Sequence, residues 1–133
     1  MTLFLDSCVL IYLIQGREPF ARHAQQALRA LAAPEAQIAL SRLTRLECRV
    51  GPMQRNDQHT LALFDRFFEH PNLIWIELSR TVVELATEIR AHCGLKTPDA
   101  LQAASCLQLG PDHHFVTGDR AFHRVAALNV TVL

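Results

Sequence analysis

Short apolar runs recur along the chain, and each has the length of a buried β-strand. The first covers residues 2–5 and ends at Asp6, and the second covers residues 37–40 and ends at Ser41. Further runs of this kind cover residues 73–78, 115–117 and 130–133. The pattern of hydrophobic positions therefore predicts five short strands.

Helical periodicity occupies the segments between the first three runs. A helix is expected to start at Asp6-Ser7, and residues 21–31 repeat alanine and leucine at the spacing of an amphipathic helix. Ser41 is a good N-cap for a helix that continues to Val50, where Gly51-Pro52 is expected to stop it. In residues 61–68, Leu61, Phe64, Phe67 and Phe68 form an apolar face that is typical of a core and is also a candidate homodimer surface.

The second half of the chain predicts three more helices. Residues 82–93 carry one apolar stripe, and Gly94 is placed to end that helix. Thr97 is expected to cap the next helix, with Pro98 and Asp99 in its first two positions, and residues 100–107 are so apolar that we expect them to be buried. A short helix over residues 120–127 precedes the last strand.

Alternation of strands and helices predicts an α/β fold of a single domain spanning residues 1–133, with a mainly parallel sheet and helices on both faces. The chain contains no internal repeat, linker or low-complexity segment that would divide it. With 133 residues, half of them hydrophobic, it is long enough to bury a core.

Net charge and cysteine spacing limit the classes of protein to which this chain could belong. The 13 basic and 13 acidic residues cancel, so any contact with a polyanion has to come from a local patch. The four cysteines lack metal-ligand spacing and lie in apolar stretches, which is typical of free buried thiols in the reducing cytosol. The N-terminal run has no basic leader and is interrupted by an acid, so we expect neither a signal peptide nor a membrane span, and a cytoplasmic location.

Candidate chemistry begins with two aspartates that directly follow strands. Asp6 and Asp119 would meet at the carboxyl edge of a parallel sheet, where such folds place their sites. Both aspartates, and Asp99 as well, would be equally suitable as residues that stabilise helix starts. Glu47 lies within a helix among arginines, and the periodicity does not bring Glu47 or Asp99 to the same edge.

The residues in their order resemble the PIN-domain ribonucleases, and most of all the VapC-type toxins of toxin-antitoxin systems. The likeness covers nearly the whole chain. The segments that carry it are Leu3-Phe4-Leu5-Asp6-Ser7, Glu47 after Ser41, Thr97-Pro98-Asp99-Ala100 with Ala103-Ala104, and Phe115-Val116-Thr117-Gly118-Asp119-Arg120-Ala121-Phe122.

This resemblance implies a three-layer PIN-like fold and a metal-dependent endoribonuclease. It implies that Asp6, Glu47, Asp99 and Asp119 are the catalytic and metal-binding acids, with Ser7 and Thr117 in support. Clustered carboxylates repel one another, and an all-oxygen ligand set suits Mg²⁺ or Mn²⁺ rather than Zn²⁺. The resemblance also implies an antitoxin protein as a partner and a homodimer.

Basic residues near these acids are candidate contacts for an RNA substrate. Lys96 is the only lysine and precedes Asp99 by three positions, while Arg42, Arg45 and Arg49 share a helix with Glu47. An ordinary solvated surface explains each of these residues equally well. The identity of the RNA cannot be read from the sequence.

Two other functional classes compete with a nuclease. A receiver-type aspartyl-phosphate switch fits poorly, because Trp75-Ile76-Glu77-Leu78 lacks the aspartate that should follow the third strand. A catalytically silent PIN-fold module for protein interaction is the stronger alternative, and the complete set of acids argues against it.

Overall fold

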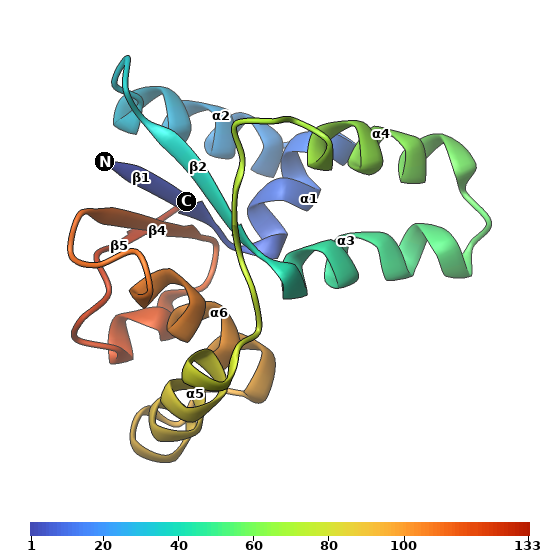
Figure 1. Ribbon diagram of the computed structural model, residues 1–133. Coiled ribbons are helices and arrows are strands. Elements are labelled where there is room, and N and C mark those ends of the chain that lie inside the picture. The colour runs from blue at the N-terminus through green and yellow to red at the C-terminus, as the bar shows by residue number, and fades with distance from the viewer.

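Five short parallel strands form a single sheet at the centre of the molecule (Figure 1). The computed structural model describes residues 1–133, and the strands cross the sheet in the order β3-β2-β1-β4-β5, with every neighbouring pair parallel. Their bounds are β1 Thr2–Leu5, β2 Gln37–Ser41, β3 Ile74–Ile76, β4 His113–Thr117 and β5 Val130–Val132. The predicted parallel five-stranded sheet is confirmed.

Helices cover both faces of this sheet, which gives the expected three-layer architecture (Figure 1). One layer contains α1 Ser7–Gln15, α2 Phe20–Leu31, α3 Arg42–Gln54 and α4 Gln58–Phe68. The opposite layer contains α5 Arg80–Cys93, α6 Thr97–Leu107 and the 3-10 helix η1 Arg120–Arg124. The hairpin of α3 and α4 projects beyond the sheet.

The two faces of the sheet are apolar because successive strand residues point to opposite sides. In β1, Leu3 and Leu5 pack against the layer of α1 to α4, while Phe4 packs against α5 and α6. Phe64 and Phe68 are buried in the first of these cores. Phe64 and Phe68 are therefore core residues, whereas Leu61 and Phe67 of the same face are only half-buried, so a homodimer surface on α4 stays a prediction.

The strand order reverses at β1, which makes the carboxyl end of this strand a topological switch point. The chain moves outward from β1 through β2 to β3, and then crosses by α5 and α6 to β4 on the other side of β1. Because the helices that follow β1 and β4 diverge to opposite faces, a crevice is expected between these two strand ends. Asp6 and Thr117 lie at this point.

Some predicted helix boundaries are wrong. Helix α3 continues through Gly51 and Pro52 to Gln54, because burial of Pro52 and packing of α3 along α4 outweigh the local cost of a proline inside a helix. Helix α6 is not capped by Thr97: Lys96 precedes it without a side-chain cap, so Thr97 is already its first residue.

The helix expected over residues 120–127 is a 3-10 turn that ends at Arg124. The chain leaves this turn in an extended conformation, which lets Val125 and Leu128 enter the core, where both are buried. None of the helices is both long and apolar enough to cross a membrane.

Removing the ring of Phe115 should strongly destabilise the protein. This side chain is fully buried between Phe4 and Phe122, with ring centroids 5.5 and 4.5 Å away. Truncation of such a core aromatic typically lowers the free energy of unfolding by about 3–5 kcal/mol, which chemical denaturation of Phe115→Ala would measure. Val83→Ala, at an exposed position of α5, is the control and should stay within about 0.5 kcal/mol of the wild type; an equal loss in both variants would contradict the role of Phe115.

Candidate active site

Asp6 occupies the carboxyl end of β1, where it caps α1 and is almost completely buried. Its Oδ1 accepts a hydrogen bond from the Ser7 backbone N–H at 2.9 Å, and its Oδ2 accepts from the Thr117 hydroxyl at 2.7 Å. The Cys8 thiol lies 3.7 Å from the same Oδ2, and burial raises the pKa of this thiol to about 12, so it remains a neutral donor. Asp6 therefore caps α1 and is at the same time one of the four candidate acids.

Glu47 reaches the same end of the sheet from α3. Its Oε1 accepts hydrogen bonds from the Ser7 hydroxyl at 2.7 Å and from the Gln102 amide at 3.1 Å. Thr44, one turn earlier on α3, lies 3.1 Å from the Ser7 hydroxyl. The glutamate, which the periodicity could not place, is thus fixed by α1 and α6 together.

Asp99 and Asp119 come from two other segments, the first turn of α6 and the residues that follow β4. The backbone N–H of Asp119 donates to the Thr117 hydroxyl at 3.1 Å. The side chain of Asp119 also caps η1 through the Ala121 N–H at 2.8 Å. Thr117 therefore connects Asp6 and the segment of Asp119.

The four carboxylates influence one another electrostatically. Burial raises the pKa of Asp6 from 3.8 to about 6 despite the hydrogen bonds from Thr117 and Ser7, and the charges of Asp99 and Glu47 add to this rise. Partial burial likewise raises the pKa of Asp99, with further contributions from the charges of Asp119 and Glu47. The structure thus couples Asp6 with Glu47 and Asp99, and Asp99 with Asp119, near the carboxyl ends of β1 and β4.

The donor set fits a hard divalent cation in chemistry, although the side chains are not closed around one. No three histidine, cysteine or acidic side chains converge closely enough to hold a metal ion in this arrangement. All the available ligands are carboxylate oxygens, and their mutual repulsion is the condition that Mg²⁺ or Mn²⁺ relieves. Asp6, Glu47, Asp99 and Asp119 are the residues that would hold such an ion.

The basic residues proposed to contact RNA lie in different environments. Lys96 is exposed at the start of α6, and its positive charge partly offsets the rise in the pKa of Asp99 that burial and the neighbouring acids cause. Arg42 pairs with Glu77 at 2.7 Å, and Arg49 pairs with the partly buried Asp65 at 2.7 Å. Arg45 lies over the ring of Phe68, 5.6 Å from its centroid. Lys96 is therefore the basic group of this set with no ion pair or stacking partner in the structure.

Two residues of the site were not recognised from the sequence. Gln102 and Thr44 are buried polar side chains beside Glu47. Their spacing along the sequence could have indicated both residues. Gln102 follows Asp99 by three positions and Thr44 precedes Glu47 by three, so each lies on the same helix face as an acid. Gln102 is also the single amide within the apolar run 100–107, which is a further indication of a specific role for this residue.

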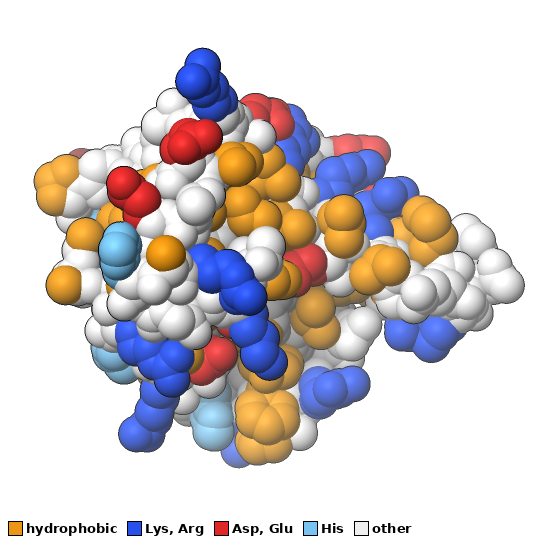
Figure 2. Space-filling model, turned by 90° about the horizontal axis from the view of Figure 1, so that it is seen from below, with side chains coloured by type: hydrophobic (Ala, Val, Ile, Leu, Met, Phe, Trp, Pro, Cys, Tyr) orange, Lys and Arg blue, Asp and Glu red, His pale blue; other side chains and the backbone are white.

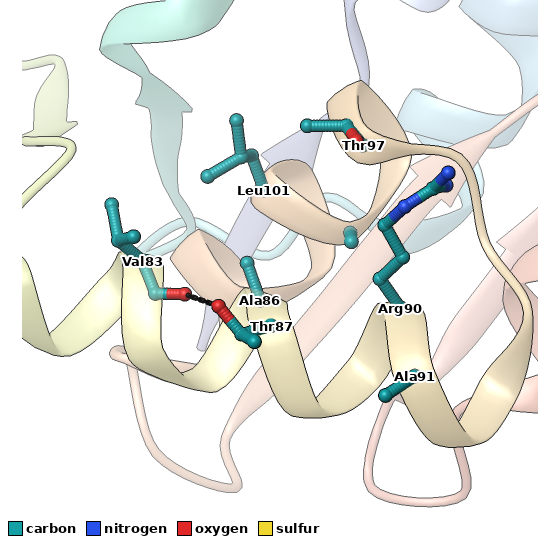
Figure 3. A pocket seen from close by; sticks show the side chains of 8 residues that line it. Val83, Ala86, Thr87, Arg90, Ala91, Thr97 and Leu101 are labelled. Atoms are coloured by element: carbon teal, nitrogen blue, oxygen red, sulfur yellow. Dashed lines mark hydrogen bonds between the residues drawn. The ribbon is translucent and has the colours of Figure 1, made fainter.

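A well-formed apolar groove lies on the opposite side of α6 from the acids. It has a volume of about 530 Å³ and runs between α5 and α6, past Val83, Arg90 and Leu101 (Figure 3). Thr97, Ala100 and Leu101 line it, whereas Asp99 and Gln102 project from the other face of the helix toward Glu47. The groove is therefore separate from the acidic crevice.

Charged side chains of both signs are interspersed on the surface (Figure 2). The face in this view has no continuous basic area, in agreement with the zero net charge. Hydrophobic side chains are exposed on the side where α3 and α4 project, and Leu46, Val50 and Met53 of α3 are among the exposed large hydrophobic residues of the molecule.

Comparison with known proteins identifies the family. The model of the PIN domain matches residues 3–128, so the chain belongs to the PIN domain family. Proteins of this family are generally nucleases and generally use divalent metal ions. No match was found among curated proteins.

Several solved structures share the fold. VapBC2 from Rickettsia felis, bound to a DNA fragment from its promoter, is 17% identical with a TM-score of 0.75, over 99% of this chain and 98% of that one. A toxin-antitoxin complex from Klebsiella pneumoniae is 28% identical with a TM-score of 0.74, over 99% and 97%. VapC20 from Mycobacterium tuberculosis, a toxin that cleaves the sarcin-ricin loop, is 15% identical with a TM-score of 0.69, over 85% and 86%.

The buried carboxylate of Asp6 should make the metal-free protein less stable as the pH rises. Between about pH 4 and pH 6 the native state keeps a proton that the unfolded chain releases, so the free energy of unfolding falls through this range. Above pH 6 the full penalty is present, of order 3 kcal/mol for the shift from 3.8 to about 6.

Denaturation in EDTA at several pH values, for the wild type and Asp6→Asn, would measure this effect. Asparagine keeps an acceptor for the Ser7 N–H and removes the charge, so its stability relative to the wild type should increase from pH 4 to pH 7. A difference that does not vary with pH would show that Asp6 titrates as it does in the unfolded chain.

Proposed function

We propose that this protein is a metal-dependent endoribonuclease and the toxin of a type II toxin-antitoxin pair. The observation that carries the proposal is the electrostatic coupling of Asp6, Glu47, Asp99 and Asp119 near the switch point of a PIN-domain sheet. Helix capping by Asp6 and Asp119 does not explain why Glu47 and Asp99 lie near them, and the repulsion among these charges is unfavourable for the fold. A catalytic role explains why they lie together.

The proposed cofactor is Mg²⁺ or Mn²⁺. When bound, such an ion neutralises the carboxylates and acts as a Lewis acid toward a phosphodiester. Asp6 and Asp99 are proposed as direct ligands, and Glu47 and Asp119 as a second set that binds an ion or orients water. Thr117 orients Asp6, and Ser7 orients Glu47, through the hydrogen bonds described above.

RNA is the proposed substrate, cut inside the chain at phosphodiester bonds. Support comes from the likeness to VapC20, which is described as cleaving the sarcin-ricin loop, and from the ribonuclease resemblance of the sequence motifs. Lys96 is the proposed phosphate contact nearest to the acids, because it is exposed and influences Asp99. The arginines of α3 are proposed only as contacts at the margin, since Arg42 and Arg49 already have acidic partners.

An antitoxin and a second copy of the chain are the proposed protein partners. Similar structures of Rickettsia felis and Klebsiella pneumoniae proteins are toxin-antitoxin complexes, which supports the first. The exposed apolar residues Leu46, Val50 and Met53 lie near one another along α3 and are of the kind that protein partners cover, which supports contact with another chain at that surface. A cytoplasmic location belongs to the same proposal.

Asp99→Asn should abolish cleavage while leaving the fold intact. The substitution keeps the size of the side chain and removes one charge, so the activity toward RNA with Mg²⁺ or Mn²⁺ should fall by about 10²-fold or more. The measurement is the rate at which fragments of a labelled RNA appear, with EDTA added in a parallel reaction. Glu88→Gln, an exposed acid of α5, is the matched control and should cleave normally.

Normal cleavage by a folded Asp99→Asn would refute the assignment of Asp99. Absence of metal-dependent cleavage by the wild type would instead favour the alternative, a catalytically silent PIN-fold interaction module. The two results are distinguishable because the wild type is tested in the same series.

Manganese should raise the melting temperature of the wild type. An ion that binds only the folded state stabilises it by mass action, by about 2.7 kcal/mol at a concentration one hundred times its Kd. The double variant Asp6→Asn with Asp99→Asn should show no such shift in a thermal denaturation experiment with and without Mn²⁺. If the shift persists in the double variant, the ion binds at another place.

A further inference from the structure

Gln102 is a polar side chain that is buried inside the protein. It is 1% exposed, and it lies on the buried face of α6 among alanine, serine and cysteine side chains. A glutamine is rarely buried so completely unless its amide has partners. Its surroundings therefore have to explain why an amide is present there.

The nitrogen of this amide lies within hydrogen-bond distance of three oxygens, and all of them belong to one network. Gln102 Nε2 is 2.9 Å from Thr44 Oγ1, 3.0 Å from Ser7 Oγ and 3.1 Å from Glu47 Oε1. These partners come from α1 and α3, so the amide of α6 joins three helices beside Glu47.

The direction of these hydrogen bonds is fixed by Glu47. The carboxylate oxygen Oε1 is the acceptor, and both the Ser7 hydroxyl at 2.7 Å and the Gln102 amide at 3.1 Å donate to it. The two amide protons can serve Glu47 and a hydroxyl of Thr44 or Ser7 at the same time. If the amide were turned round, its oxygen would face the carboxylate oxygen, and two acceptors would oppose each other.

The other end of the amide has no partner. Gln102 Oε1 is buried and is the one buried side-chain polar atom in the protein without a hydrogen bond. A buried carbonyl without a donor lowers stability, so packing alone would favour an apolar side chain of similar length at this position. The hydrogen bond from the amide nitrogen to Glu47 is therefore the contact that explains a glutamine at this position.

We propose that Gln102 is a positioning residue for Glu47. Its amide holds the carboxylate in one orientation, with Ser7 as the second donor, so that Glu47 stays within electrostatic reach of Asp99. The inference rests on the proposed function, because the orientation of Glu47 matters only if Glu47 serves the metal site or the reaction. Residues that orient ligands from behind typically change metal affinity or activity by about 10- to 100-fold when replaced.

Gln102→Met tests the proposal, since methionine keeps the length of the side chain and removes both donors. The expected results are a Kd for Mn²⁺ raised about 10-fold, measured by electron paramagnetic resonance of the free ion, and a kcat lowered about 10-fold at saturating Mn²⁺. The KM should stay within about twofold, because Gln102 does not contact the substrate. The substrate is a mixed-sequence RNA oligonucleotide with a fluorophore and a quencher.

Gln108→Met is the matched control, because Gln108 is an exposed glutamine at the end of the same helix, bonded only to the Ala104 carbonyl. It should leave the Kd, the kcat and the KM unchanged. A purely structural role for Gln102 predicts a lower melting temperature with the wild-type Kd and kcat in the folded protein, and that result would overturn the proposal. If the wild type itself neither binds Mn²⁺ nor cleaves RNA, the proposed function fails, and the inference fails with it.

A crystal structure of the wild type with Mn²⁺ gives an answer even if Gln102→Met does not fold. The proposal requires Gln102 Nε2 to remain within hydrogen-bond distance of Glu47 Oε1 when the ion is present. The proposal would be contradicted if Glu47 no longer lay within hydrogen-bond distance of the Gln102 amide. It would also be contradicted if the oxygen of the amide, and not its nitrogen, faced Glu47.

Discussion

Burial of the Asp6 carboxylate is the constraint around which the site is built. A charged group at the end of the central strand is unfavourable unless its charge is compensated, and two hydrogen bonds leave its pKa at about 6. The nearby Asp99 and Glu47 increase this imbalance. The fold therefore places carboxylates near one another without basic side chains that pair with them, which is the property that the proposed metal site requires.

Ser7 connects the two halves of the hydrogen-bond network. Its backbone N–H binds Asp6, and its hydroxyl binds Glu47, so one residue at the start of α1 orients two acids. Thr117 has a similar role at the end of β4. Its hydroxyl donates a hydrogen bond to Asp6 and accepts one from the backbone N–H of Asp119. Short side chains on rigid elements thus determine where the carboxylates point, while α6 supplies Asp99 and the amide of Gln102.

The absence of net charge limits how the protein can attract a polyanion. Long-range steering depends on an overall or locally concentrated field, and here the basic residues are dispersed and partly paired. Affinity for a nucleic acid would then depend on contacts close to the crevice. Leu46, Val50 and Met53 are exposed on α3, the helix that also carries Glu47, so a partner bound there, as proposed above, would affect access to the acids.

The local sequence pattern was sufficient to predict most of the fold, because strand length, helical periodicity and helix capping depend on residues that are close in the sequence. The five strands, their parallel arrangement and the positions of Asp6 and Asp119 at strand ends follow from such rules. The continuation of α3 through Pro52 did not, because packing against α4 outweighs the local preference of proline.

For the site, the sequence by itself determined two acids, and resemblance to a family added Glu47 and Asp99 together with the supporting Ser7 and Thr117. Only the tertiary structure decided that Glu47 is held by α1 and α6, and that Gln102 has its amide nitrogen in this network and its oxygen without a partner. The physical reason is distance along the chain. Gln102 and Ser7 are 95 positions apart, and no periodicity within one helix or strand can indicate that their side chains meet.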